Sequence, residues 1–431
     1  MYRRDFIENI SKATLAGALP TNELVFEGRE TFPFKGQNTL WSEIGEYFPM
    51  DGYTNLRSLW TGISPNFVIE KYKSNIEKLF SNKPTDLRYK GQTDFDTQLK
   101  ATREIVASYF GAESDEIAFV RNTTEGLMNV IFGLDFKRGD EIIISNQEYS
   151  LVKGSLEQLK AQKGIVVKQV KLPLEPTSAH DLVEPFKNAL TEKTKAIFCC
   201  HVYLSGLVFP VKELKKSVGE DIFVIVDGAL AIGTLDLNFT ELGCDFYAGS
   251  FHKAMGLPRG MGFLFMKKIH IESTWPLFGH YNIFRRKPGY LLDTIKKFEH
   301  YGQFPDYHFV LIADLIEFHE KIGKAEIENR LKFLKNYWTN KVKDHDSVKF
   351  ITPLSDAFSS SLVTFQIKGK TPKEVETKLE EERILVASTM IDALEAVEPS
   401  RYMANVVFLN VNIFNSTQQL DYLAERLLTL T

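Results

Sequence analysis

Apolar and polar segments alternate along the first two thirds of the chain, and their spacing predicts helices layered on a sheet. Helices are expected over 64–81, 97–110, from about 125, and over 151–162, and strands over 117–120, 141–145 and 166–170. Gly111 fits the C-terminal cap of the second helix. Strands that alternate with helices in this way are typical of an α/β domain with a mostly parallel sheet.

Three further apolar runs, at 222–226, 245–248 and 262–266, predict buried parallel strands. Asp227 ends the first run and Lys253 follows the second. Both side chains should lie at the carboxyl ends of the strands and face one crevice. The pair suits a pyridine aldehyde cofactor, because a lysine forms the imine and an aspartate keeps the ring nitrogen protonated.

The stretch around these residues resembles the class V aminotransferase family of pyridoxal-phosphate enzymes, on its isopenicillin N epimerase-like and cysteine desulfurase-like branch. Three motifs carry the resemblance: Val226-Asp227-Gly228-Ala229-Leu230, Cys244-Asp245-Phe246-Tyr247 and Ser250-Phe251-His252-Lys253. It implies the PLP-dependent transferase fold type I, an α/β fold. A large domain would hold a mostly parallel sheet sandwiched by helices, followed by a smaller C-terminal α+β domain.

The resemblance also implies roles for the residues of the last motif and for Asp227. Lys253 would form the Schiff base with the cofactor and act as the catalytic base. Asp227 would bind the ring nitrogen, and Ser250 and His252 would donate hydrogen bonds to the cofactor phosphate. Without these neighbouring residues, we would interpret Lys253 as a surface lysine that follows a strand.

Other cofactor contacts are carried over from the family. Thr123 and Thr124 precede a predicted helix and would bind the phosphate there, although such residues are also ordinary helix caps. Tyr149 would stack on the pyridine ring; its alternative is a loop tyrosine packed on the core. Gln303 stands where the family has a threonine that reaches the partner subunit's phosphate, so a homodimer is implied.

Two departures from the family pattern concern the substrate. Leu230 replaces a glutamine that contacts the ring hydroxyl of the cofactor. Phe408 aligns with an arginine that clamps the substrate carboxylate, and its loss predicts a weaker preference for plain α-amino acids. Arg401, Arg285 or Arg286 could take over that contact.

After Met266 the pattern indicates a second unit. Helices are expected over 306–322, 325–342, after Pro372 and over 417–430, and strands over 362–367, 384–387 and 406–411. We therefore expect an N-terminal arm at 1–50, a large cofactor-binding domain at 51–295 and a small C-terminal domain at 296–431. Residues 21–51 show no sustained period and predict irregular structure.

The N-terminal twenty residues have two interpretations. Arg3-Arg4 followed by the apolar stretch 13–19 resembles a twin-arginine export signal over 1–20, which would place the protein in the periplasm. The alternative is a basic amphipathic helix on a cytoplasmic protein.

Composition narrows the partners. The 431 residues carry a net charge of −4, which gives no electrostatic case for binding nucleic acid or an anionic membrane. No apolar run approaches the roughly 18 residues of a membrane span, and no metal site is expected. A small-molecule amino substrate is the expected partner.

We predict a class V aminotransferase- or epimerase-like enzyme and leave transamination, epimerisation and elimination open. A cysteine desulfurase is not favoured, because all three cysteines (Cys199, Cys200 and Cys244) precede Lys253. One alternative is a catalytically altered scaffold or binding protein of the same fold. Another is a doubly wound protein that binds a different phosphate ligand, which leaves the Lys253–Asp227 pairing unexplained.

Overall fold

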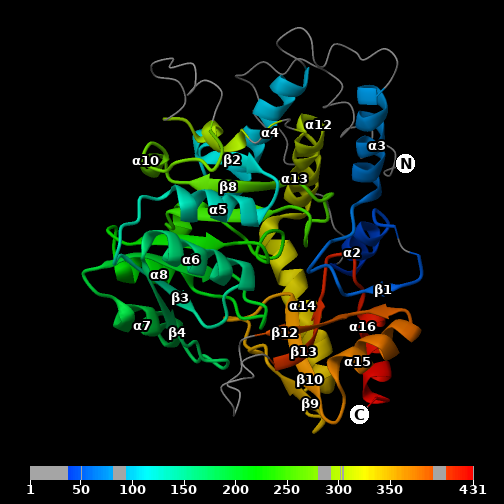
Figure 1. Ribbon diagram of the computed structural model, residues 1–431. Coiled ribbons are helices and arrows are strands. Elements are labelled where there is room, and N and C mark those ends of the chain that lie inside the picture. The colour runs from blue at the N-terminus through cyan, green and yellow to red at the C-terminus, as the bar shows by residue number, and fades with distance from the viewer. Residues whose placement is uncertain are drawn as a thin grey trace.

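A seven-stranded sheet forms the centre of the larger part of the computed structural model, which describes residues 37–49, 51–80, 94–279, 293–300, 302, 305–391 and 404–430 (Figure 1). The strand order is β2 (Ile117–Val120), β8 (Gly262–Met266), β7 (Phe246–Ser250), β6 (Phe223–Asp227), β5 (Thr194–Cys200), β3 (Glu141–Ser145) and β4 (Val166–Val170). Strands β7, β6, β5, β3 and β4 are parallel. The predicted mostly parallel sheet is therefore confirmed.

Strand β8 corrects one prediction. The run 262–266 was expected to be parallel, but β8 is antiparallel to both β7 and β2. The connection 251–261 is too short for the helical crossover that two parallel neighbours require, so the chain must return in the opposite direction.

Helices cover both faces of this sheet. Ile142 and Ile144 point into a core shared with α5 (Thr123–Gly133) and α6 (Ser150–Lys163), whereas Ile143 points into the core on the other face. That second face is covered by α4 (Asp94–Phe110), α7 (Ala179–Ala189) and α8 (Val211–Val218). Strands buried on both faces explain why their sequences read as continuous apolar runs.

A second, four-stranded antiparallel sheet lies beside the first, with α14 (Lys324–Val342) between the two (Figure 1). Its order is β12 (Ala387–Ile391), β13 (Ala404–Asn410), β10 (Leu362–Ile367) and β9 (Val348–Phe350), with α15 (Pro372–Glu381) and α16 (Thr417–Leu428) packed near it. The expected smaller α+β unit is thus present. The division of the chain at residues 295 and 296 stays a prediction.

The remaining elements include three differences from the sequence-based expectations. These elements are α2 (Gln37–Gly45), β1 (Thr54–Asn55), α3 (Asn66–Phe80), η1 (Ser114–Glu116), α9 (Phe239–Leu242), α10 (Lys268–Ile271), η2 (Ile295–Glu299), α12 (Asp306–Phe309), α13 (Leu311–Ile322) and β11 (Ile384–Leu385). The single helix expected over 306–322 is two helices, and the strand expected over 384–387 is divided between β11 and β12. Helix α2 lies in the stretch expected to be irregular, where Trp41 and Ile44 are buried one turn apart.

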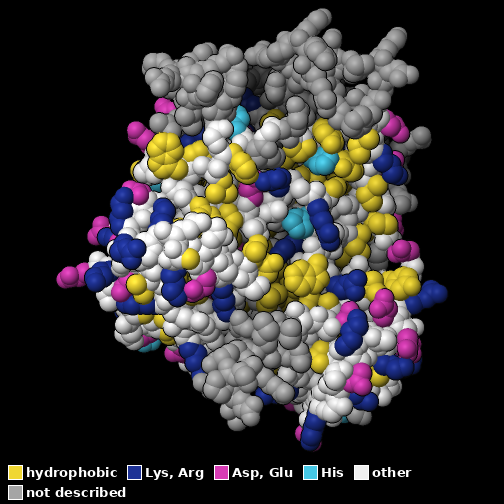
Figure 2. Space-filling model, in the orientation of Figure 1, with side chains coloured by type: hydrophobic (Ala, Val, Ile, Leu, Met, Phe, Trp, Pro, Cys, Tyr) yellow, Lys and Arg dark blue, Asp and Glu magenta, His cyan; other side chains and the backbone are white. Residues whose placement is uncertain are grey.

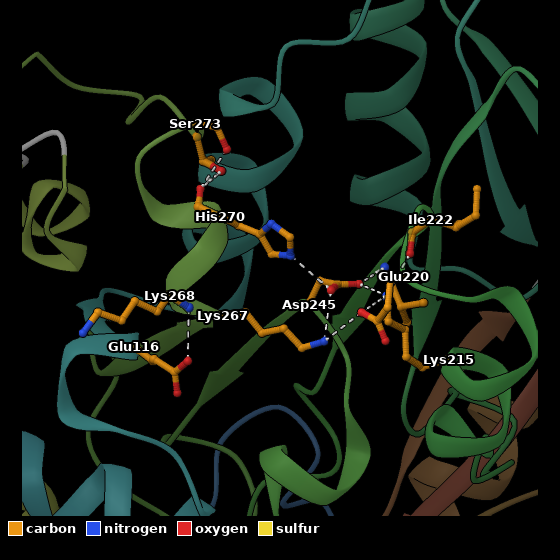
Figure 3. A network of polar contacts seen from close by, with 11 residues as sticks. Glu116, Lys215, Glu220, Ile222, Asp245, Lys267, Lys268, His270 and Ser273 are labelled. Carbon is orange, nitrogen blue, oxygen red and sulfur yellow. Dashed lines mark hydrogen bonds and ion pairs between the residues drawn. The ribbon is translucent and has the colours of Figure 1, made fainter.

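A buried ion network fixes the amino end of β7. Asp245 accepts hydrogen bonds from Lys215 Nζ at 2.9 Å and from the Val224 N–H at 2.8 Å, and its other oxygen lies 3.1 Å from His270 Nε2 and 3.3 Å from Lys267 Nζ (Figure 3). Among the described residues, no helix has both the length and the apolar character that crossing a bilayer requires.

Candidate active site

The loop that follows β7 carries Lys253, which is half-buried. The segment before α3 holds this loop in place: the Gly62 N–H donates to the His252 carbonyl oxygen at 2.9 Å, and the Ser64 hydroxyl donates to the Gly256 carbonyl. A Cβ atom on Gly62 would lie 1.9 Å from the Lys253 carbonyl oxygen. Only glycine permits that approach, so the position of the lysine loop depends on residue 62.

Asp227 ends β6, the neighbour of β7 in the sheet, and its carboxylate is buried. Its Oδ1 accepts the Ala229 N–H at 2.9 Å. Burial raises the pKa of Asp227, and the positive charge of Lys253 acts in the opposite direction. Burial likewise lowers the pKa of Lys253, while the Asp227 charge raises it. Each of the two groups thus shifts the pKa of the other through its charge.

The amino end of α5 lies beside the end of β7. Asn122 caps the helix by accepting the Glu125 N–H at 2.9 Å. The Thr123 N–H donates to Ser250 Oγ at 2.8 Å, and the two hydroxyl oxygens lie 2.6 Å apart. Thr124, the next residue, is half-buried. A helix amino terminus lined by hydroxyls suits a phosphate, because the helix dipole is positive there.

His252 presents a buried atom without a partner: its Nδ1 has no hydrogen bond within the described structure. Burial lowers the pKa of His252 to about 4, helped by the charges of Lys253 and Arg259. The imidazole is therefore neutral at pH 7 and able to donate to an anion. A buried nitrogen left unpaired is costly unless a ligand completes it.

Glu148 is a second buried carboxylate whose charge interacts with that of Asp227. It accepts hydrogen bonds from Ser145 at 2.9 Å, Tyr203 at 3.0 Å and the Cys200 thiol at 3.2 Å. Burial raises its pKa to about 7, despite these donors, and the Asp227 charge adds to the increase. The next residue, Tyr149, is 38% exposed and precedes α6. Its stacking on a ring stays a prediction.

Sequence reasoning gave no role to His201 and Tyr247. The His201 N–H donates to the Asp227 carbonyl oxygen at 2.9 Å, and its Nδ1 lies 3.0 Å from the Tyr247 hydroxyl. A Cβ atom on Gly228 would lie 1.9 Å from the Tyr247 ring. The signal in the sequence is the position of His201, the first polar residue after an apolar strand.

Several predicted contacts fall outside the described residues. They are Gln303, Arg285, Arg286, Arg401 and the possible export signal at 1–20. The nearby Glu299 is described: Arg103 and the Phe119 N–H donate to its carboxylate. The three cysteines are buried: Cys199 and Cys200 lie in β5, and Cys244 lies just before β7.

Comparison with known proteins identifies the family of this chain. The chain matches the family model of aminotransferase class-V over residues 58–423 and belongs to this family. The predicted resemblance is thereby confirmed.

Relatives of different activity match the chain about equally well. Isopenicillin N epimerase of Amycolatopsis lactamdurans is 26% identical over 348 residues, covering 77% of this chain and 86% of the relative. A probable cysteine desulfurase of Halalkalibacterium halodurans is 26% identical over 414 residues, covering 89% and 96%.

Solved structures share the fold. A cysteine desulfurase of Thermococcus onnurineus has a TM-score of 0.78 at 22% identity, covering 90% of this chain and 97% of its own. A C-DES mutant with glycine covalently linked to its PLP cofactor has a TM-score of 0.75 at 20% identity, covering 89% and 98%.

Proposed function

We propose that the protein is a pyridoxal-phosphate-dependent enzyme that acts on an amino acid or a related amine through a Schiff base at Lys253. Membership of the class V family indicates that the cofactor is pyridoxal 5'-phosphate, which is also present in the C-DES structure of the same fold. The observation that carries the proposal is that Asp227 ends β6 and Lys253 follows β7, its parallel neighbour, at the same edge of the sheet. Each group also shifts the pKa of the other.

The residues present fit this cofactor. When bound, pyridoxal phosphate supplies an aldehyde that amines attack and a ring that takes up electrons. Burial lowers the pKa of Lys253, so a larger fraction of it is in the uncharged amine form that can attack an aldehyde or accept a proton. The buried Asp227 lacks a direct cation and suits a protonated ring nitrogen. The unpaired His252 Nδ1 and the amino end of α5 suit the phosphate.

Borohydride trapping tests the proposal. Protein saturated with pyridoxal phosphate and reduced with borohydride should carry the label on Lys253 and none in Lys253→Ala. Lys297 is an internal control, because burial lowers its pKa to about 8 at a place away from Asp227. Labelling of Lys297 or another lysine in place of Lys253, or no labelling at all, would show the proposal to be wrong.

We further propose that the reaction is of the aminotransferase or epimerase kind and not desulfuration. Burial raises the pKa of Cys199, Cys200 and Cys244, so these thiols resist forming the thiolate that attacks sulfur. Cysteine should therefore yield no sulfide. Sulfide release that disappears in Cys200→Ala would contradict this.

A homodimer is the assembly we propose, with Gln303 reaching the partner's site. Light scattering should give twice the chain mass of 49.3 kDa. Mixing Lys253→Ala with Gln303→Ala protein should restore part of the activity that each lacks.

A further inference from the structure

An apolar wall is formed by residues close in sequence to Asp227 and to the segment that holds the Lys253 loop. Leu59, Leu362, Ala387 and Phe408 form a buried cluster, and the half-buried Leu204 and Leu230 pack against it. Trp60 completes this apolar wall: its ring meets the Phe408 ring edge-on, with centroids 6.0 Å apart, and it stays 41% exposed. Trp60, Leu204 and Leu230 thus present apolar surface to solvent, with Phe408 behind them.

Hydrogen bonds fix the position of the apolar wall relative to the reactive groups. Leu230 is three residues after Asp227, and Leu204 is three residues after His201, whose N–H bonds the Asp227 carbonyl. Trp60 is two residues before Gly62, whose N–H bonds the carbonyl of the residue before Lys253. Each exposed part of the apolar wall is therefore tied to the lysine loop or to the carboxyl ends of β5 and β6.

The apolar wall has no charged side chain, and two described arginines, Arg57 and Arg259, already contact other side chains. Arg57 lies 3.7 Å from Glu376, and Arg259 donates to the Thr61 hydroxyl at 2.7 and 3.0 Å. A carboxylate placed against these described apolar side chains would lose its hydration and gain no donor from them. An alkyl or aryl group there would instead be removed from water, which is favourable. Figure 2 shows hydrophobic side chains gathered across the middle of one face, with Lys, Arg and His side chains among them.

We propose that the apolar wall selects an alkyl or arylalkyl amine that lacks an α-carboxylate. The proposal rests on the proposed function, since the amine nitrogen must reach the cofactor at Lys253. Trp60, Leu204 and Leu230 would contact the apolar part of the amine. They are specificity-determining contacts and take no part in proton transfer.

Two compounds that differ only in the carboxylate provide the test: 2-phenylethylamine and phenylalanine. Dissociation constants come from the spectral shift of the bound cofactor and from calorimetry, and kcat/KM is measured in parallel. The amine should bind at least 10-fold more tightly than the amino acid. Trp60→Ala and Leu230→Gln should each reduce this ratio several-fold. Trp275→Ala is the matched control, because Trp275 is also an exposed tryptophan, 58% accessible, but lies at the far end of α5. Its backbone N–H donates there to the Gly133 carbonyl oxygen.

Equal or tighter binding of phenylalanine would overturn the proposal, whichever residue holds its carboxylate. So would equal ratios for Trp60→Ala and Trp275→Ala. Borohydride labelling separates the two levels of failure: a label on Lys253 without a preference for the amine overturns only this inference. Absence of that label overturns the proposed function and this inference together.

Discussion

Two buried aspartates lie at opposite ends of the same pair of strands, β6 and β7, and their surroundings differ. Asp245 lies within ion-pair distance of two lysines, Lys215 and Lys267, and beside His270 (Figure 3). Burial raises its pKa, but the hydrogen bonds with His270 and Lys215 outweigh burial and lower it to about 2. Asp227 receives one backbone N–H and the charge of a lysine without direct contact, and burial raises its pKa.

This difference is the one expected between a structural carboxylate, Asp245, and a carboxylate that we propose binds a ligand, Asp227. A buried charge contributes to folding only when its partners replace the water it loses. Asp245 has those partners within the chain, and together they tie β7 to α8 and α10. Among the described residues, Asp227 has only one backbone N–H and no direct cation, which supports the proposal that the ring nitrogen of the cofactor completes its pairing. The predictions below test this contrast.

The largest effect is expected from Asp245→Asn. The change leaves the buried Lys215 facing a neutral side chain, and breaking a buried pair of this kind costs about 3–5 kcal/mol. Urea denaturation of the cofactor-free protein at pH 7 should report that loss. Because the folded pKa lies below the unfolded value of about 3.9, the stabilisation should vanish as the pH falls towards about 2.

Asp115→Asn is the control for this change. Asp115 pairs with Lys268 at 2.5 Å, but the pair is exposed and therefore hydrated and screened, so its loss should cost far less. Equal losses for the two variants would remove the distinction between a buried network and a surface pair.

Asp227→Asn should behave in the opposite way. Folding of the cofactor-free protein should be unchanged or slightly more favourable, because a raised folded pKa means that the fold disfavours the charged form. Cofactor affinity should fall about 10- to 100-fold, the worth of a charged hydrogen bond of ~1.5–3 kcal/mol. Asp314→Asn is the control: it is also buried with a raised pKa, but it pairs with Lys71. A stability loss at Asp227 as large as that at Asp245 would end the comparison.

The sequence predicted one half of this contrast better than the other. Asp227 could be singled out because it ends a continuous apolar run and is followed in sequence by Lys253. The role of Asp245 could not, since its partners Lys215 and His270 come from helices distant in the chain. The hydrogen bond from the Gly62 N–H to the lysine loop was missed for the same reason: it joins segments far apart in the sequence and leaves no local pattern. The antiparallel direction of β8 followed from a short connection, which a pattern of apolar runs does not reveal.

Smaller effects, on cofactor binding or on folding, are expected from replacing either of two histidines with alanine. His252→Ala should weaken binding of pyridoxal phosphate by up to about 10-fold, the worth of one hydrogen bond, with little change in folding, because Nδ1 has no partner to lose. His201→Ala should do the reverse: it leaves the buried Tyr247 hydroxyl unpaired, at a cost of about 1–3 kcal/mol. Thermal denaturation and cofactor titration of both variants check this crossed pattern. The pattern would be contradicted if His252→Ala destabilised the fold and His201→Ala did not.

The smallest effect is a shift in one titration. Burial lowers the pKa of Lys253, whereas the hydrogen bond from Lys268 to Asp115 raises the pKa of that exposed lysine. Competitive acetylation of the cofactor-free protein, followed by mass spectrometry across pH, should therefore give a midpoint below the usual 10.5 for Lys253 and above it for Lys268. In Asp227→Asn the midpoint for Lys253 should fall further, because the charge that opposes burial is gone. An unchanged Lys253 midpoint in that variant would mean that the two groups do not act on each other. Burial alone would then account for the pKa of Asp227, and the lysine could no longer be counted among its surroundings.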